Sequence, residues 1–292
     1  MTILVTAASG HLGRLVVESL LARGAEPADI VATARDTSKL EDLAARGIRT
    51  AVLDYDRPDT IAAALDGVDA VLLISGSIPG VRVQGHRNVI DAAKAAGVAK
   101  LVYTSAPKAT TAEDFPLAAD HQATEEAIAA SGVPAVILRN DWYTENYVRE
   151  VTRAAQTGVI AGSAGDGRVA SAPRADYADA AAVVLLEDGH VGQVYELGGD
   201  DPWSFDELAA AASEIVGREV TYRRLTTEEH VAALEAAGLD AGAAGFVAGL
   251  DDAIRRGILG DSDRTLSRLI GRPTTPLVDA LRNAVAAQAS AA

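Results

Sequence analysis

Short apolar runs recur along the first half of the chain and alternate with stretches whose apolar residues lie three and four positions apart. An apolar run without alternation is typical of a strand buried on both faces, and the intervening spacing is typical of helices. Several helical stretches are followed by a glycine where a left-handed residue ends a helix. These glycines are Gly47, Gly67, Gly97 and Gly132. The predicted strands are Ile3–Thr6, Ile30–Ala34, Thr50–Leu53, Ala70–Ile74, Leu101–Thr104 and Ala135–Leu138, and the helices are Ser38–Ala45, Thr60–Leu65, Val81–Ala96 and Leu117–Ala130.

The pattern changes after Asn140. The stretches Val159–Ala161 and Val169–Ser171 flank a glycine-rich segment in which Asp166-Gly167 favours a hairpin turn, so we expect the two stretches to pair. Beyond them the pattern predicts helices near Asp176–Glu187, Ser204–Val216, Thr227–Ala237 and Ala248–Arg256, with strands at Val194–Leu197 and Val220–Arg224.

Alternation of strands and helices indicates a parallel sheet with helices on both faces. We therefore predict an α/β fold, a Rossmann-type doubly wound parallel sheet with a smaller C-terminal α/β lobe. The boundary is placed between residues 140 and 141, with elements at about 174–200 packing back on the sheet. Open sheets of this kind bind ligands at the carboxyl edge, so residues 141–292 are expected to form a lobe on the substrate side.

The turn after the first strand is the most informative segment. The strand runs into Thr6-Ala7-Ala8-Ser9-Gly10-His11-Leu12-Gly13, and a helix with an apolar face follows. Backbone N–H groups and the positive end of a helix dipole attract phosphate at such a turn. An ordinary tight turn is the alternative, but the strand before and the helix after favour a dinucleotide site. The residues expected to contact the cofactor here are Ala7, Ser9, Gly10, His11, Leu12 and Gly13.

The end of the second strand selects between the two nicotinamide cofactors. An acidic residue there would hold the ribose 2′-hydroxyl of NAD, but this strand ends in Arg35, with Lys39 following. A guanidinium suits a 2′-phosphate, so NADP(H) is predicted and Asp36 is expected to point the other way. The alternative is that Arg35 and Lys39 are solvated loop charges.

Two further segments are assigned to the cofactor from their place in the fold. Ser75-Gly76-Ser77 follows the fourth strand and is expected to pass the ribose and the nicotinamide. Asp54 ends the third strand, near the expected adenine.

The acid–base pair common in alcohol dehydrogenases of this fold is missing. No tyrosine has a lysine four residues on, so no tyrosine with a lysine-lowered pKa can transfer the proton. At the place of that pair, His121 and Glu125 stand one turn apart, where they could interact. We favour the interpretation that they are polar residues near a helix start.

Aromatic and amide side chains gather where the sixth strand ends. Trp142, Tyr143 and Tyr147 fall close together in a chain that is only 4% aromatic, and Asn140 and Asn146 lie among them. Planar rings could stack on a flat substrate while the amides donate to its carbonyls. The alternative is that Trp142 and Tyr147 anchor the core of the second lobe, and we expect this of at least one of them.

Composition excludes several classes of function. A net charge of −15 disfavours nucleic acid and anionic membranes. The chain has no cysteine, which excludes disulfides and thiolate chemistry, and its five scattered histidines predict no metal. No apolar run is long enough for a membrane span, and a strand starting at residue 3 leaves no room for a signal peptide. A cytoplasmic protein is expected.

The order of several motifs resembles the NmrA-like group of atypical short-chain dehydrogenases, which includes bacterial NADPH:quinone oxidoreductases. The resemblance covers nearly the whole chain. It rests on Ala8–Gly13, Gln84–Lys94, Leu138–Tyr147, Gly165–Gly167, Arg174–Tyr177 and Leu269–Thr275.

The resemblance implies a reductase that passes a hydride from NADPH to a small quinone-like acceptor. A quinone accepts hydride readily, so a missing acid is compatible with catalysis by orientation. The segment from Asn140 to Glu145, Trp142 included, would line the nicotinamide end, with Asn140 and Tyr143 as the catalytic residues. The family has glycine where this chain has Ala7; we expect its methyl to be tolerated if φ is negative, and to weaken cofactor binding if it crowds the pyrophosphate.

Two other functions stay open. One is a non-catalytic regulator of the NmrA type that senses redox state by binding NADP(H), and the other is a reductase of azo or nitro compounds. Dimers are common among such folds, and a homodimer is a hypothesis without assigned interface residues.

Overall fold

The chain divides into two units in the computed structural model, which describes residues 1–112 and 114–290. Unit 1 comprises Met1–Thr110, Leu117–Asn140 and Arg174–Glu196. Unit 2 comprises Thr111–Pro116, Asp141–Pro173 and the chain from Leu197 onward.

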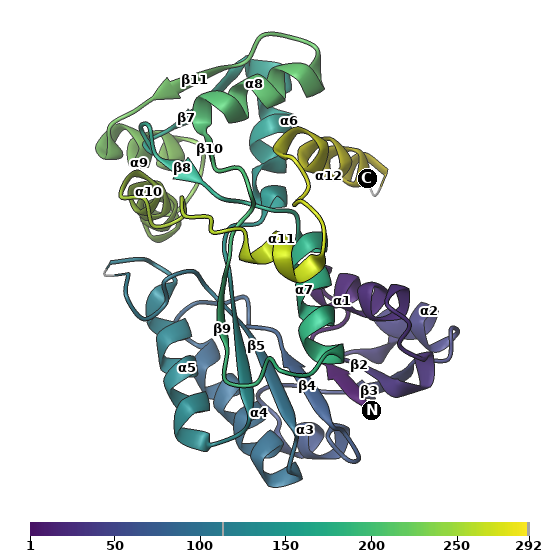
Figure 1. Cartoon of the computed structure of the whole chain (residues 1–292). Coiled ribbons are helices and arrows are strands. Elements are labelled where there is room, and N and C mark those ends of the chain that lie inside the picture. The colour runs from purple at the N-terminus through teal and green to yellow at the C-terminus, as the bar shows by residue number, and fades with distance from the viewer. Residues whose placement is uncertain (113, 291–292) are drawn as a thin grey trace. The chain divides into compact units, whose positions relative to one another are not determined.

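Unit 1 is built on a seven-stranded sheet of order β3-β2-β1-β4-β5-β6-β9 (Figure 1). The neighbouring pairs from β3 to β6 are parallel. Chain order reverses between β1 and β4, which is the switch point where sheets of this type bind ligands. The strands are β1 (Ile3–Val5), β2 (Ile30–Ala34), β3 (Arg49–Val52), β4 (Ala70–Leu73), β5 (Lys100–Ser105), β6 (Ala135–Asn140) and β9 (Val194–Leu197).

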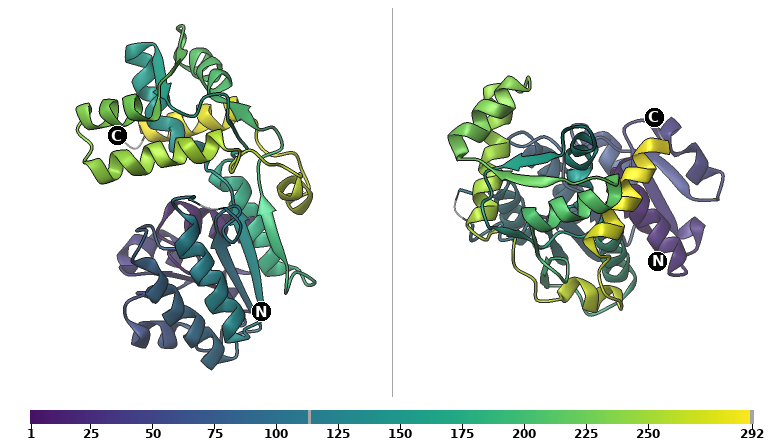
Figure 2. Two further views of the ribbon diagram at one scale, coloured as in Figure 1. Left: turned by 90° about the vertical axis from the view of Figure 1, so that its left-hand side faces the viewer. Right: turned by 90° about the horizontal axis from the view of Figure 1, so that it is seen from above.

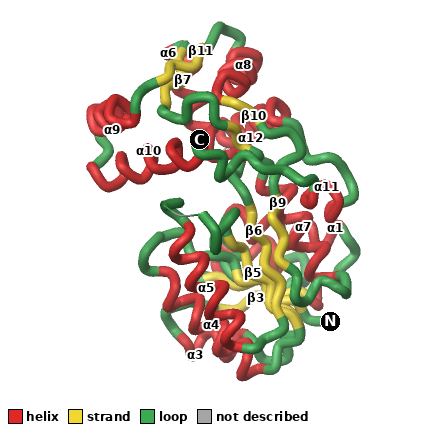
Figure 3. Tube along the Cα trace, turned by 60° about the vertical axis from the view of Figure 1, so that its left-hand side comes forward, coloured by secondary structure: helices red, strands yellow, loops and turns green. Residues whose placement is uncertain are grey.

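Helices cover both faces of this sheet. On one face α4 and α5 lie side by side (Figures 2 and 3), and on the other α1 packs against α7 (Figure 1). The helices are α1 (His11–Ala22), α2 (Glu41–Ala44), α3 (Pro58–Ala64), α4 (Arg82–Ala96), α5 (Ala118–Ser131) and α7 (Arg174–Leu186), with short 3-10 helices η1 (Pro27–Asp29) and η2 (Thr37–Leu40).

Burial explains why these strands could be predicted. Every residue of β1, β2, β4 and β5 is buried, so apolar side chains predominate in β1, β2, β4 and the centre of β5, while the two ends of β5 carry buried polar residues. The observed strands of unit 1 agree with the predicted ones to within two residues. The four glycines predicted to end helical stretches all have positive φ, from 68° at Gly67 to 86° at Gly47.

Unit 2 contains two small sheets and most of the C-terminal helices. Its strands are β7 (Val159–Gly162), β8 (Arg168–Val169), β10 (Trp203–Ser204) and β11 (Thr221–Arg224). Its helices are α6 (Val148–Thr157), α8 (Phe205–Val216), α9 (Thr227–Ala236), α10 (Ala241–Arg255), α11 (Thr265–Ile270) and α12 (Leu277–Ser290), with the 3-10 helix η3 (Thr144–Tyr147).

The predicted hairpin in this unit is wrong. β7 pairs in parallel with β11, and β8 pairs antiparallel with β10, so the two stretches beside Asp166-Gly167 have different partners. The glycine-rich turn is a local signal, whereas the pairing is decided by strands far along the chain. Helix α10 also begins earlier than predicted, because the Asp240 side chain accepts a hydrogen bond from the Ala243 N–H and caps it.

None of the helices in the described part of the chain combines the length and the apolar character needed to cross a bilayer.

Candidate cofactor and active site

The turn between β1 and α1 leaves backbone donors open to an anion. The Gly10 N–H donates to the Ala7 carbonyl at 2.9 Å, which closes the turn directly before the helix. Gly10 is the N-cap of α1, and no side chain in the described part of the chain caps it. The N–H groups of the first helical turn have no carbonyl within the helix to bind. Together with the helix dipole they form a site for a phosphate group.

Gly13 lets the helix approach this turn closely. A Cβ atom at Gly13 would lie 2.4 Å from the Ala7 carbonyl oxygen and 2.8 Å from the Ala8 Cα. Both neighbours are backbone, so neither can move aside without shifting the turn. A side chain at this position is therefore incompatible with the observed geometry.

Ala7 corrects one expectation. Its φ is +49°, which lies in the left-handed region, so its methyl is not accommodated by a negative φ. A residue with a Cβ costs about 1 kcal/mol or more there relative to glycine. Its side chain is exposed, so the cost arises in the backbone of Ala7 itself.

Two cations at the end of β2 are available for a ligand. Arg35 and Lys39 are exposed, and neither side chain makes a hydrogen bond or an ion pair with another described residue. Asp36 does not compete for them, because its carboxylate accepts from the Ser38 N–H at 3.0 Å and caps η2. Arg14 is likewise engaged, pairing with Asp42 and donating to the Lys39 carbonyl.

Asp54 is bound to its own turn. Its N–H donates to the Thr60 hydroxyl at 3.0 Å, and its Oδ1 accepts from the Asp56 N–H at 3.1 Å. Its position just after β3 agrees with the predicted one, and it lies partly buried at the carboxyl end of that strand.

The segment Ser75–Ser77 is tied to buried side chains. The Ser75 N–H donates to the Thr104 hydroxyl at 3.0 Å, and the Gly76 N–H donates to Nε2 of His86 at 2.9 Å. Arg82 donates to the Gly76 carbonyl at 3.1 Å. The prediction included Ser75, Gly76 and Ser77 but missed these supports. Their signal is the pair of polar residues four positions apart inside α4.

The end of β5 holds a neutralised carboxylate. Ser105 donates to Glu125 at 2.6 Å, and Glu125 forms a two-point ion pair with Arg139. Arg139 also bonds Glu196 at 2.9 Å. Both of these carboxylates raise the pKa of the Arg139 guanidinium, which is partly buried and stays charged. The interaction that the spacing of His121 and Glu125 allowed is not formed, because each bonds to other side chains in the described part of the chain.

His121 belongs to the core of unit 1. Its Nδ1 lies 2.8 Å from the Tyr103 hydroxyl, and burial lowers the pKa of His121 to about 3. His121 and Glu125 thus have different partners: His121 contacts Tyr103 on β5, whereas Glu125 contacts Ser105 on β5 and Arg139 on β6.

The aromatic segment after β6 divides between site and core. Asn140 is 5% exposed, and Trp142, Tyr143 and Glu145 are partly buried. Tyr147 is a core residue of unit 2, with its ring 4.9 Å from that of Trp203 in an edge-on arrangement. The expectation that one aromatic residue anchors the second lobe is therefore confirmed for Tyr147.

A serine, a histidine and an aspartate meet in unit 2 but do not form a nucleophilic triad. Ser163 Oγ lies 3.1 Å from Nδ1 of His230, and Asp251 Oδ2 lies 3.0 Å from the same nitrogen. A triad needs the serine and the acid on opposite ring nitrogens. This trio instead links β7 to α9 and α10.

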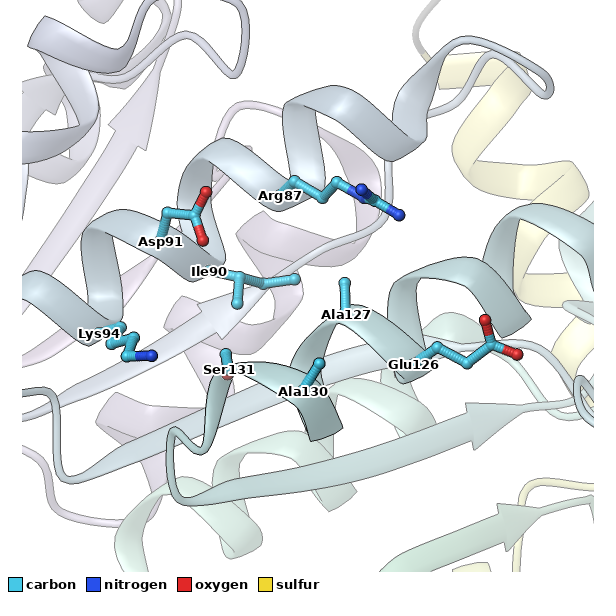
Figure 4. Close-up of a pocket in the computed structure, with 8 residues that line it drawn as sticks. All are labelled: Arg87, Ile90, Asp91, Lys94, Glu126, Ala127, Ala130 and Ser131. Atoms are coloured by element: carbon cyan, nitrogen blue, oxygen red, sulfur yellow. The ribbon is translucent and has the colours of Figure 1, made fainter.

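A groove of about 440 Å³ lies on the outer side of α4 and α5 (Figure 4). Its walls carry charged side chains of both signs, among them Arg87 and Glu126, around alanines of α5. It is separate from the loops at the carboxyl edge of the sheet, and we assign it no catalytic role.

Comparison with known proteins identifies the cofactor class. Residues 7–188 match the model of the NAD(P)H-binding family, which covers more than half of the chain. The chain belongs to this family. The matched region begins at Ala7, in the turn just after β1, and includes α1 and the strands β2 to β6, so the predicted dinucleotide cofactor is confirmed.

Relatives of known function cover the whole length of the chain. It is 46% identical over 279 residues to quinone oxidoreductase 2 of Escherichia coli strain K12, covering 96% of this chain and 97% of that protein. The structure of an Escherichia coli NADPH-dependent quinone oxidoreductase complexed with NADPH superposes with a TM-score of 0.92 at 45% identity, covering 97% and 99% of the two chains. The Citrobacter triphenylmethane reductase complexed with NADP(H) gives 0.91 at 36% identity, covering 97% and 100%. The predicted Rossmann-type fold is confirmed.

Proposed function

We propose that this protein is an NADPH-dependent reductase that transfers a hydride to a quinone or a similar conjugated acceptor. Full-length similarity to an Escherichia coli quinone oxidoreductase supports the reaction. Similarity to a dye reductase supports a flat conjugated acceptor in general.

The proposed cofactor site follows the carboxyl edge of unit 1. The pyrophosphate binds the open N–H groups of His11, Leu12 and Gly13, with Ala7, Ser9 and Gly10 beside it. Arg35 and Lys39 bind the 2′-phosphate, and Asp54 lies near the adenine. A free guanidinium gains a charge-assisted bond from a phosphate and little from a hydroxyl, so NADPH is preferred over NADH.

The observation that carries the proposal is the ion pair at the end of β5. Ser105 donates to Glu125, and both oxygens of Glu125 are held by Arg139. No acid is left there to protonate a substrate oxygen during hydride transfer. A general acid contributes roughly 10²–10⁴-fold, which an unactivated carbonyl needs and a quinone does not. The arrangement therefore favours an acceptor that is already electrophilic.

The nicotinamide supplies the hydride when the cofactor is bound. We place the segment Asn140–Glu145 beside it, with Asn140 polarising the quinone oxygen and the rings of Trp142 and Tyr143 against the flat acceptor. The quinone takes the hydride, and one proton from water completes the quinol. Unit 2, which carries Trp142 and Tyr143, is the proposed substrate lobe. We further propose that the protein acts in the cytoplasm. We also propose that it forms a homodimer, and size-exclusion chromatography with light scattering tests this oligomeric state.

A panel of acceptors with the Asn140→Ala variant tests this function. We expect quinone-dependent oxidation of NADPH, and a lower kcat in Asn140→Ala with the NADPH Kd unchanged. Unchanged turnover in the variant would remove Asn140 from the mechanism. Faster turnover of an azo or nitro compound than of every quinone would show that the acceptor is of that class instead of a quinone. Tight NADPH binding without turnover on any acceptor would favour a redox-sensing regulator.

A further inference from the structure

The backbone of Gly76 is held at both of its polar groups by buried side chains of α4. His86 Nε2 accepts from the Gly76 N–H at 2.9 Å, and Arg82 Nη1 donates to the Gly76 carbonyl at 3.1 Å. A Cβ atom at Gly76 would lie 3.0 Å from the Arg82 Cβ. One glycine of a loop at the sheet edge is therefore fixed in position by two side chains of a neighbouring helix.

The hydrogen bonds around His86 define its tautomer. The Thr124 hydroxyl donates to the Asp120 carbonyl at 2.8 Å, so it has no proton left for His86. It lies 2.9 Å from Nδ1 of His86 and must accept from an N–H there. Nδ1 is then the protonated nitrogen and Nε2 the acceptor, which is the role the Gly76 N–H requires. His86 is fully buried, and burial lowers its pKa to about 4, so the ring is neutral.

Arg82 is anchored by α5, the helix that also carries Thr124. Its Nε donates to Asp120 Oδ2 at 3.0 Å, and that oxygen also accepts from the Gly80 N–H at 2.7 Å. Asp120 and Thr124 are one turn apart on α5, as Arg82 and His86 are on α4. Two parallel connections thus run from α5 through α4 to Gly76.

This arrangement is costly for a contact between two helices. Nη2 of Arg82 is buried and has no hydrogen-bond partner among the described residues. A buried polar group without a partner destabilises the fold, and apolar side chains would join α4 to α5 without that penalty. What the polar side chains add is a defined backbone position at Gly76.

We infer that His86 is a positioning residue for the cofactor, which acts by accepting the Gly76 N–H and so holding Ser75–Ser77 in the conformation that receives the nicotinamide ribose. This inference rests on the cofactor placement proposed above. It does not depend on the acceptor, because the loop contacts NADPH whether or not a quinone follows.

Two substitutions at His86 separate its two hydrogen bonds. His86→Gln places an amide oxygen near the position of Nε2 and retains the acceptor for Gly76. His86→Asn places an amide N–H near the position of Nδ1 and retains only the bond to Thr124. Both variants are polar, neutral and smaller than or close to histidine in size, so a general packing defect affects both. We would measure the Kd of NADPH by calorimetry and the Tm of the cofactor-free full-length protein.

We expect His86→Asn to raise the NADPH Kd roughly three- to tenfold, the effect of one lost hydrogen bond, and His86→Gln to stay within about twofold of wild type. Equal Kd changes in the two variants, no change in either, or a larger change in His86→Gln would each overturn the inference. A separation of the two Kd values in a protein that reduces no quinone would leave this inference standing and reject the proposed function. Quinone reduction with no separation would do the reverse.

The wild-type protein offers a second test that needs no variant. Long-range proton–nitrogen NMR spectra of the ring report which nitrogen carries the proton. We expect the Nδ1–H tautomer of His86, together with slow exchange of the Gly76 amide. A proton on Nε2 would overturn the inference, because that nitrogen could not accept from Gly76.

Discussion

The two ends of the proposed cofactor site in unit 1 are built in opposite ways, although the strands that lead into them, β1 and β4, are neighbours in the sheet. The turn Ala7–Gly13 presents backbone N–H groups that no side chain of the described residues caps. Arg35 and Lys39 are exposed, and neither bonds to another described side chain. The segment Ser75–Ser77 has its backbone held by Thr104, His86 and Arg82.

The difference follows from what each end has to do. A phosphate is recognised by positive charge and by free hydrogen-bond donors, so the residues that bind it must not use these donors in bonds to one another. Hydride transfer depends on the position of the nicotinamide, so the loop beside it gains from support. Substitutions at the phosphate end are expected to change cofactor binding through steric clashes and lost charge. Substitutions at the nicotinamide end are expected to change it through the loss of buried hydrogen bonds.

Gly13→Ala has the largest expected effect, because its Cβ would overlap the backbone of Ala7 and Ala8. We expect the free energy of unfolding to fall by about 3 kcal/mol and the NADPH Kd to rise at least about tenfold. Urea denaturation and calorimetry measure the two quantities. Gly245→Ala is the control, since its Cβ would meet no atom within 4 Å and glycine disfavours a helix. Near-wild-type behaviour of Gly13→Ala would contradict the close approach.

Arg35→Ala is next in size and tests the open, charged end. Loss of a charge-assisted contact with the 2′-phosphate is expected to raise the KM for NADPH about ten- to a hundredfold. The KM for NADH should change little, because NADH lacks that phosphate. Steady-state kinetics with both cofactors measure the difference, and Lys39→Ala provides a weaker companion variant. Equal effects on the two cofactors would contradict the assignment.

Acidification probes the buried end. Burial, with a smaller contribution from Arg82, lowers the pKa of His86 to about 4, while Asp120 opposes it; an unfolded histidine titrates near 6.5. The unfolded state therefore binds more protons as the pH falls from about 6.5 to about 4. The contribution of His86 should lower the free energy of unfolding in that window by up to about 1.4 kcal/mol per pH unit. Above about pH 6.5 its titration should not change the free energy of unfolding.

His86→Gln removes this titration and is the matched variant for the pH experiment. We expect its unfolding free energy to depend less steeply on pH in the same window, while His121 and the carboxylates titrate in both proteins. Parallel curves for the two proteins would show that His86 is not a buried neutral ring.

Ala7→Gly has the smallest expected effect and refines the account of the open end. Glycine adopts the positive φ of residue 7 without strain, but it also raises the conformational entropy of the unfolded chain, which offsets part of the gain. The variant should therefore be more stable by about 1 kcal/mol or less and bind NADPH at least as tightly. Denaturation and calorimetry again measure this. A less stable Ala7→Gly protein would show that the alanine is not strained.

The sequence predicts the parts of this fold that depend on neighbours in the chain. The buried strands and the glycines after helices are local signals, and they agree with the structure. The pairing of β7 with β11 and of β8 with β10 depends on residues far apart, so a strong turn signal at Asp166-Gly167 led to the wrong pairing.

The site divides along the same line. The turn Ala7–Gly13 and Arg35 could be predicted as site residues because their signals lie within single segments. The supports of Gly76 were missed because four side chains from two helices must meet. Spacing alone also left open an interaction between His121 and Glu125 that does not form. Their partners, Tyr103 for one and Arg139 for the other, come from different strands and leave no local trace.

The most direct test of the central claim is the oxidation of NADPH by the wild-type protein without oxygen, followed by the absorbance of the reduced nicotinamide, with and without 1,4-benzoquinone and repeated with NADH. The account predicts oxidation that requires the quinone and clearly prefers NADPH. Tight NADPH binding with no oxidation above the rate without protein would contradict it.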